Sequence, residues 1–333
     1  MESTTKNRQP VSVLRTLVER AYGAGQVPEG DDFAHEITEG WFNVAYRIVL
    51  RDGQQVVLKI APPAEIPVLT REVGMMRAEL EAMRLVSTQT SVPVPRVDYV
   101  DLSHEVVDAD LFFMEYVVAD NFGLSADAGR LSPEVVAAGN RELGALNREI
   151  NTVVGPHFGP LLGEGSATWR EAFTTMIEDT LDDGERVGID LGWEPDQIRA
   201  VLAENSDALD EVTVPQLVEV DLWAKNSMIR DGRIVAILDH ERAVYGDPLM
   251  EAGLTGLDMP FFGDPTEFMA GFGLTELTPN ERTRRRLYSL YLALIMVVET
   301  KYRGHTDTEI YDLGRRELDA VMAALGHARP STA

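Results

Sequence analysis

The sequence of 333 residues contains no cysteine. Disulfides, thiolate zinc sites and cysteine nucleophiles are therefore all excluded. No stretch reaches the run of about 18 apolar residues that predicts a transmembrane helix. The N-terminal sequence MESTTKNRQPVSV has no charged region followed by an apolar one, so we predict no secretory signal. We therefore expect a cytoplasmic protein without a membrane partner.

Several common site motifs are also absent. The six histidines are dispersed, and no HExxH or other histidine pair at metal-binding spacing occurs. The sequence has no GxSxG, no Walker A motif and no GxGxxG, which disfavours a nucleophile elbow, a P-loop and a Rossmann nucleotide site. The net charge of -25 disfavours nucleic acid, because phosphate contacts need a basic surface. The same acidity could attract a cationic substrate or serve solubility alone.

The first part of the chain is predicted to be a sheet with few helices. Helical spacing predicts helices over 11–24 and 70–86, the second ended by the prolines of VPVPRV. Alternating apolar residues predict strands at 33–38, 44–50, 55–61, 97–101 and 111–117. Residues 1–10 are polar and expected to fray. We predict an α+β N-terminal lobe, residues 1–117, built on a five-stranded antiparallel sheet.

The rest of the chain, residues 118–333, is predicted to be a mostly helical C-terminal lobe. Residues 119–132 are expected to be a loop at the boundary, followed by Ser132 as N-cap and Pro133 at the first helical position. The arginine-rich RTRRR at 282–286 is expected to be a solvated helix face. The predicted helices of this lobe are 133–150, 169–185, 195–209, 279–303 and 306–325.

The stretch 217–248 gathers oxygen-bearing side chains around a predicted hairpin. An apolar strand leads to Asp221, a short loop carries Asn226, and the hairpin 227–239 ends on Asp239. Its turn, Arg230-Asp231-Gly232, lies between alternating apolar arms and is a strong hairpin signal. Grouped oxygen ligands suit Mg²⁺. Asp-x₄-Asn followed by Asp after a short hairpin is typical of kinase-like sites, where the first Asp orients the attacking hydroxyl and the other two residues hold Mg²⁺ against ATP phosphates.

Lys59 lies in an apolar strand, where an unpaired charge is costly to bury. It is either an edge or snorkelling lysine, or a point charge that holds phosphates with a carboxylate partner on the next helix. That helix offers Glu72 and Glu79, one heptad apart on the same face. The segment LFFMEYV is either a plain strand followed by a linker or a connection between the lobes that presents backbone groups of Glu115 and Val117 to adenine.

Lys225, beside Asn226, has two interpretations. It is either an exposed loop lysine or a residue that reaches a phosphate.

The chain resembles the aminoglycoside phosphotransferase family, which is related to choline kinases and more distantly to protein kinases. The segments that carry the resemblance are EGWFNVAYRI, VVLKIAPP, MRAELEAMRLV, VPVPRV, FFMEYV, VDLWAKN and ILDHERAVYGDPLMEAG. The last two are similar to the family's HGDLxxxN and IDWExAxxGDPxxD signatures. The resemblance implies a bilobal protein-kinase-like fold and Mg²⁺-dependent transfer of phosphate from ATP (or GTP) to a small-molecule hydroxyl. That acceptor would be an aminoglycoside-like antibiotic, associated with antibiotic resistance, or a related metabolite.

The resemblance also assigns roles to single residues. Asp221 matches the catalytic base, and Asn226 and Asp239 match the metal ligands. Lys59 matches the phosphate-binding lysine, with Glu79 as its best-matching partner and Glu72 as the fallback.

Two segments depart from the family pattern. Glu219-Val220 stands where the family has His-Gly, and His240 stands where it often has Trp. The first departure motivates an alternative, a non-catalytic pseudokinase-like protein that binds a nucleotide or ligand.

Acceptor recognition is the least determined feature. Acidic Glu251 and Asp258 could receive a cationic acceptor, while Glu241 and Asp247 match structural or substrate-adjacent positions. An uncharged hydroxylated acceptor is equally compatible, and both a monomer and a homodimer fit the sequence.

Overall fold

The computed structural model describes residues 3–38, 40 and 42–327, which divide into two compact units. The first unit comprises Met1–Val68, Pro95–Val118 and Tyr302–His305. The second comprises Leu69–Val94, Ala119–Lys301 and Thr306–Ala333. Within the described ranges, no helix has the length and apolar character needed to cross a membrane.

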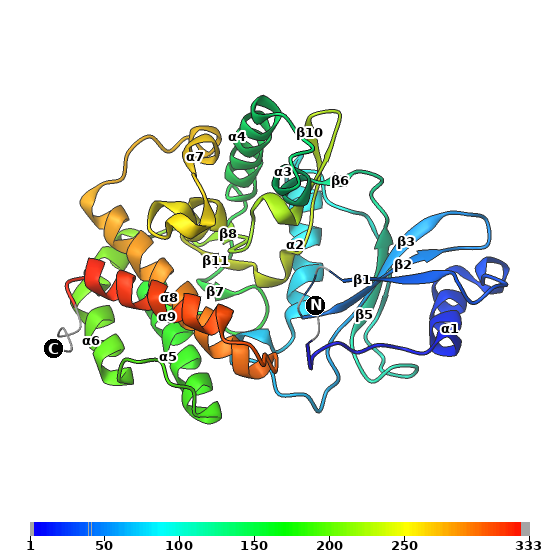
Figure 1. The fold of residues 1–333 in the computed structure, drawn as a ribbon, viewed down its shortest axis with the longest axis horizontal. Helices are drawn as coiled ribbons and strands as arrows, with labels where there is room; N and C mark the ends of the chain where they lie inside the picture. Colours follow the sequence, from blue (N-terminus) through cyan, green and yellow to red (C-terminus); the bar gives the residue numbers. More distant parts are fainter. Residues whose placement is uncertain (1–2, 39, 41, 328–333) are drawn as a thin grey trace. The chain divides into compact units, whose positions relative to one another are not determined.

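The first unit is built on a five-stranded antiparallel sheet (Figure 1). The strand order is β1-β2-β3-β5-β4, so β3, which carries Lys59, is the central strand and not an edge. The five predicted strands are therefore confirmed, although the last ends at Glu115. Their bounds are β1 Ala34–Ile37, β2 Val44–Val49, β3 Gln55–Ile60, β4 Val97–Asp101 and β5 Leu111–Glu115.

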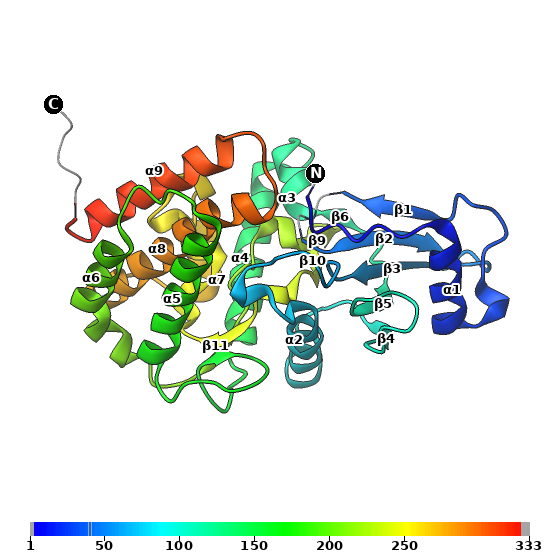
Figure 2. The same ribbon diagram turned by 90° about the horizontal axis from the view of Figure 1, so that it is seen from below.

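Helix α1, Val11–Tyr22, covers the apolar face of this sheet (Figure 2). Its buried residues Leu14, Leu17 and Val18 share one core with strand residues two apart, as the period of a strand requires. A short 3-10 turn, η1 Ala24–Gln26, follows the helix. The core side chains from the strands are Val44, Tyr46, Ile48, Val56, Leu58, Ile60, Leu111 and Phe113.

The N-terminal segment is held in place, which corrects the expectation of fraying for residues 3–10. Thr5 is fully buried, and its hydroxyl donates to the Phe42 carbonyl at 2.9 Å. The Lys6 ammonium donates to the Asn43 carbonyl at 2.6 Å. Polar side chains predict exposure, but here they donate to the carbonyl groups of the loop between β1 and β2. Residues 1–2 lie outside the described residues.

The second unit holds most of the helices. Helix α2 begins at Met75 and not at Thr70, because Gly74 has a left-handed backbone (φ 74°) that separates it from the 3-10 turn η2, Thr70–Glu72. Helices α4 and α7 pack side by side (Figure 1). The bounds are α2 Met75–Gln89, α3 Phe122–Asp127, α4 Pro133–Ile150, α5 Trp169–Val187, α6 Pro195–Asn205, α7 Thr266–Phe272, α8 Pro279–Tyr302 and α9 Glu309–Ala324.

Two three-stranded sheets complete the second unit. One has the order β10-β9-β6 and the other β7-β11-β8. The predicted hairpin is confirmed: β9 and β10 are antiparallel, and both turn residues, Asp231 (φ 53°) and Gly232 (φ 75°), are left-handed. The bounds are β6 Asp120–Asn121, β7 Gly159–Pro160, β8 Gln216–Val218, β9 Ser227–Arg230, β10 Arg233–Ile237 and β11 Val244–Gly246.

Two other sequence expectations for this unit were wrong. The predicted boundary loop 119–132 contains β6 and α3, whose N-cap is the side chain of Asn121. The arginine-rich segment 282–286 is not a solvated face, because Arg284 and Arg285 are buried. Arg284 donates to Asp247 at 2.8 Å, and Arg285 donates to the Leu249 carbonyl. The buried acceptors that hold these arginines are distant in sequence, so the charge run alone was misleading.

Candidate functional site

The structure brings Asp221, Asn226 and Asp239 together at the end of the β9–β10 hairpin. The Asn226 side-chain amide donates to the backbone carbonyl of Asp221 at 2.9 Å. The Asn226 carbonyl accepts from the backbone N–H of Leu238 at 2.8 Å, which places Asn226 beside the residue before Asp239. The Asp239 carboxylate is in turn near enough to raise the pKa of Asp221.

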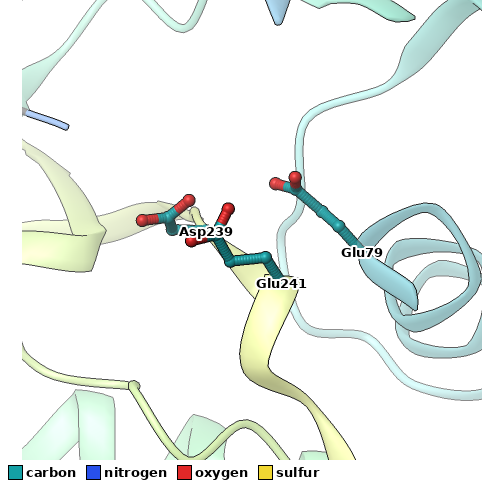
Figure 3. A group of neighbouring side chains, drawn as sticks. All are labelled: Glu79, Asp239 and Glu241. Atoms are coloured by element: carbon teal, nitrogen blue, oxygen red, sulfur yellow. The ribbon is translucent and has the colours of Figure 1, made fainter. Parts of the chain in front are cut away.

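Asp239 lies at a strained point of the backbone. Its φ of 66° is left-handed, a conformation in which an L-residue costs about 1–2 kcal/mol and which Asp tolerates better than most. The turn η5, His240–Arg242, follows and packs against α2. Oxygen atoms of Glu79, Asp239 and Glu241 lie within 4.8 Å of one another (Figure 3). These three side chains offer only oxygens, the ligand type that Mg²⁺ prefers.

Asp221 combines partial exposure with a perturbed pKa. Its side chain is 28% exposed, and Arg242 lies 3.6 Å from its carboxylate. Removal from water raises the pKa of Asp221, the Arg242 charge opposes this shift, and Asp239 adds to it. A carboxylate with a raised pKa is better suited to accept a proton than an ordinary surface aspartate.

Arg242 was not singled out from the sequence, yet it contacts the candidate base. It also lies 3.9 Å from Glu299 on α8. Burial lowers the pKa of Arg242, but the neighbouring Asp221 and Glu299 carboxylates outweigh it and leave the pKa raised. A single arginine within an acidic segment gives no sequence signal for this contact, because Glu299 is distant along the chain.

The two departures from the family pattern touch each other. The Glu219 carboxylate lies 3.0 Å from Nδ1 of His240, and both side chains are buried. The other ring nitrogen of His240 faces the Ile237 carbonyl at 3.2 Å. Burial lowers the pKa of His240, but the Glu219 charge outweighs it and leaves the pKa above its ordinary value. The pair is therefore a buried acid–histidine contact at hydrogen-bonding distance.

Glu251 does not lie on the surface to receive a substrate, which corrects the suggestion from sequence. It is fully buried and accepts from the Glu219 N–H at 2.9 Å and from Asn151 at 3.3 Å. Burial raises the pKa of Glu251 to about 8, with help from the Glu219 charge. Asp258 is also largely covered, and its carboxylate lies 3.5 Å from buried Arg285.

Glu241 and Asp247 were predicted to be structural or substrate-adjacent. Of these two residues, Asp247 is structural. Its carboxylate accepts from Arg284 at 2.8 Å and from the Tyr288 hydroxyl at 2.6 Å. Glu241 instead belongs to the oxygen cluster with Glu79 and Asp239.

Lys59 and its two candidate partners are divided between the compact units. Lys59 is buried in β3 of the first unit, whereas Glu72 and Glu79 belong to the second. Within that unit the Glu72 carboxylate accepts from the Leu69 N–H at 3.0 Å and lies 3.5 Å from Arg71. Glu79 instead lies with Asp239. The pairing of Lys59 stays a prediction.

The predicted adenine contacts lie at the end of β5. The Glu115 N–H donates to the Arg96 carbonyl at 2.9 Å, so this N–H is not the group that a base would contact. Val117 follows two residues later.

The Lys225 side chain is 40% exposed. Its ammonium lies 3.0 Å from Asp127 and above the Trp223 ring.

Solved structures of phosphotransferases share this fold. A thermostable mutant of aminoglycoside phosphotransferase APH(4)-Ia is 17% identical, with a TM-score of 0.65 over 93% of this chain and 98% of that chain. The gentamicin complex of APH(2")-IIa is 14% identical, with a TM-score of 0.65 over 95% and 98%. A proposed fructosamine-3-kinase from Thermobifida fusca is 19% identical, with a TM-score of 0.60 over 93% and 99%. At these identities the likeness establishes the fold, and the predicted kinase-like α+β class is confirmed.

The sequence itself carries the family assignment. No curated protein sequence matches this chain. The model of the phosphotransferase enzyme family, by contrast, matches residues 34–288, which include both β3 with Lys59 and the complete segment 217–248. The chain therefore belongs to the phosphotransferase enzyme family.

Proposed function

We propose that this phosphotransferase moves the γ-phosphoryl group of ATP, with GTP as the alternative donor, to a hydroxyl of a small molecule. The observation that carries the proposal is the grouping of Asp221, Asn226 and Asp239 by one loop and one hairpin. Phosphoryl transfer needs a group that orients the attacking hydroxyl and oxygen ligands for a metal, and these residues supply both. Membership of the phosphotransferase enzyme family supports the same reading.

Asp221 has the role of the base in this proposal. Its carboxylate would accept a hydrogen bond from the acceptor hydroxyl and take the proton as the new bond forms. The hydrogen bond from the Asn226 side-chain amide to the Asp221 backbone carbonyl supports a fixed loop geometry. Because little covalent chemistry is required of the protein, this positioning supplies much of the rate enhancement.

Mg²⁺, when bound, supplies positive charge that neutralises the donor phosphates. Asn226 and Asp239 would hold it. The Asn226 amide nitrogen is engaged with the Asp221 carbonyl, so Oδ1 is the ligand atom of this side chain. Every donor in this set is an oxygen, which fits Mg²⁺ better than a softer metal.

For the donor nucleotide we assign Lys59 to the phosphates and Glu79 as its partner. The local hydrogen bond of Glu72 to Leu69 supports Glu79 over Glu72. Backbone groups of Glu115 and Val117 would contact adenine. With this assignment, residues 1–117 would form the nucleotide-binding lobe and residues 118–333 the lobe that binds the acceptor. We propose that the reaction takes place in the cytoplasm, because ATP is available there.

The acceptor is proposed to be an antibiotic of the aminoglycoside type or a related hydroxylated metabolite, with a role in antibiotic resistance in the first case. Proteins of the same fold have been solved with hygromycin B and AMP-PNP, with streptomycin and ATP, and with gentamicin. The net charge of -25 supports a cationic acceptor. Glu299, near Arg242 and Asp221, is better placed to meet such a molecule than the buried Glu251.

A non-catalytic, pseudokinase-like ligand-binding protein is the alternative, and one observation favours it. Val220, next to the candidate base, has a left-handed backbone (φ 65°) that a β-branched residue rarely adopts. Retention of Asp221, Asn226, Asp239 and Lys59 supports catalysis instead, because a binding protein does not need the base.

The test is release of ADP from Mg·ATP by the wild-type protein with a panel of hydroxylated acceptors, cationic aminoglycosides and neutral sugars or nucleosides in separate arms. Phosphorylated product should appear by mass spectrometry in at least one arm. Binding of Mg·ATP without product in any arm would favour the non-catalytic alternative.

A further inference from the structure

The buried Glu219–His240 pair joins the two segments that carry the candidate catalytic and metal residues. Glu219 lies two residues before Asp221, and His240 directly follows Asp239. The Glu219 carboxylate lies 3.0 Å from the His240 ring, and the two residues are 3% and 0% exposed. The contact therefore fixes one segment against the other at a point adjacent to both functional residues.

The pair is also anchored on its outer sides. The Glu219 N–H donates to Glu251 at 2.9 Å, and the second His240 nitrogen faces the Ile237 carbonyl at 3.2 Å. A buried polar group that loses its hydrogen-bond partner is costly, so such a pair resists separation. Each residue thus holds its own backbone segment as well as its partner.

In both segments the backbone is strained at the residue next to the pair. Among the described residues, left-handed non-glycine backbones occur at His104, Val220, Asp231 and Asp239. Val220 and Asp239 are the direct neighbours of Glu219 and His240. Strained conformations of this kind persist only when the surrounding structure fixes them. The buried contact between Glu219 and His240 is an interaction that can do so on both sides at once.

We propose that Glu219 and His240 are positioning residues that together set the separation and orientation of Asp221 and Asp239. The proposal rests on the function proposed above. It also explains why two departures from the family signature occur in the same chain, since the residues concerned are in contact. Glu219 and His240 form one unit, so giving either position the residue type of its partner should disturb the contact.

A purely structural role would give a different pattern. A pair that only stabilised the fold would lower the free energy of unfolding when broken, and activity would follow the folded fraction. A positioning pair lowers kcat and the affinity for Mg·nucleotide even when the protein is fully folded. Trp193→Phe is the matched control. It removes the 2.7 Å hydrogen bond from the buried Trp193 indole to Asp319, on elements that carry none of the candidate site residues.

The experiment compares Glu219→His, His240→Glu and the double exchange, which restores one acid and one histidine with their ends exchanged. Glu219→Gln is included because it keeps the shape of the side chain and an acceptor for the His240 ring. The readouts are kcat, KM for ATP, binding of Mg·AMP-PNP by calorimetry, and unfolding in urea. Each single exchange should lower kcat by about tenfold or more at temperatures where it is folded, because small displacements of reacting groups are costly.

The double exchange should recover most of the lost kcat and nucleotide affinity, and Glu219→Gln should retain most of both. A double variant no better than its weaker parent would overturn the proposal. So would losses of kcat that match those of Trp193→Phe at equal stability. Absence of product from the wild type, with Mg·AMP-PNP binding lost and restored as predicted, would refute phosphotransfer and leave the positioning role standing. A wild type that neither binds nucleotide nor forms product would refute both.

Discussion

The side-chain amide of Asn226 donates a hydrogen bond to the backbone carbonyl of Asp221 at 2.9 Å. The contact spans five positions and closes the loop between β8 and β9 on itself. It gives Asn226 two roles, because the nitrogen fixes the loop while the oxygen can serve as a ligand. The spacing Asp-x₄-Asn is thus a requirement of loop geometry as well as of chemistry.

Asp221→Asn should abolish phosphoryl transfer, with a fall in kcat of about a thousandfold or more, because an amide cannot accept the hydroxyl proton. Nucleotide binding and the unfolding midpoint should stay close to wild type, since the amide has the same shape. Asp231→Asn is the matched control, because Asn-Gly serves the hairpin turn as well as Asp-Gly. Substantial turnover in Asp221→Asn would contradict the assignment of the base.

Asp239→Asn should weaken binding of Mg·ATP by about tenfold or more, because a charged oxygen ligand is replaced by a neutral one. Asn tolerates the left-handed backbone of Asp239, so the turn itself should be retained. Calorimetry with ATP in the presence and absence of Mg²⁺ measures the effect. The Mg²⁺-dependent part of the affinity should be lost, and an equal loss without Mg²⁺ would point to a general disturbance of the site.

Local sequence patterns predicted the elements that lie close together in the chain. The alternation in 44–60 and the Asp231-Gly232 turn each specify a strand pair through neighbouring residues, and both pairs form. The start of α2 was missed because Gly74 was read as a helix residue, whereas its left-handed backbone begins a new helix. Thr5 and Lys6 are fixed by hydrogen bonds to the carbonyls of Phe42 and Asn43. No local sequence pattern indicates these contacts.

The candidate site divides in the same way. Asp221, Asn226 and Asp239 were found because their spacing lies within one short segment. The pairing of Glu219 with His240 and of Arg242 with Asp221 could not be found, because it depends on how two loops pack. The sequence suggested that Glu251 is a surface acid, whereas the fold buries it in the interior. Charge in the sequence does not distinguish these environments.

At position 220, the glycine variant should be more stable than the alanine variant, the reverse of the usual order. At φ 65° any Cβ costs about 1–2 kcal/mol, which outweighs the entropy that glycine loses on folding. Val220→Ala and Val220→Gly both remove the valine methyl groups, so their difference in unfolding free energy isolates the strain. Val220→Gly should be the more stable of the two by about 1 kcal/mol.

Exposed Val73, with φ -64°, provides the control for this pair. There Val73→Gly should be less stable than Val73→Ala. The same order at both positions, measured by urea unfolding, would show that Val220 carries no strain.

Glu251→Gln should flatten the dependence of stability on pH. The folded pKa of Glu251 is about 8, above the ordinary value of 4.5, because the side chain is buried beside Glu219. Between these values the folded protein keeps a proton that the unfolded chain has released, so the free energy of unfolding falls as the pH rises. Below this range the group is protonated in both states, and above it the group is ionised in both.

Gln is neutral throughout and keeps an oxygen for the Glu219 N–H, so the variant lacks this fall. From about pH 5 to about pH 8 the wild type should lose a few kcal/mol of unfolding free energy that the variant keeps. Urea unfolding across this range measures both curves, and exposed Glu276→Gln controls for the loss of one negative charge. If the Glu251→Gln curve runs parallel to that of the wild type, Glu251 is ionised in the folded protein and its burial does not shift its pKa.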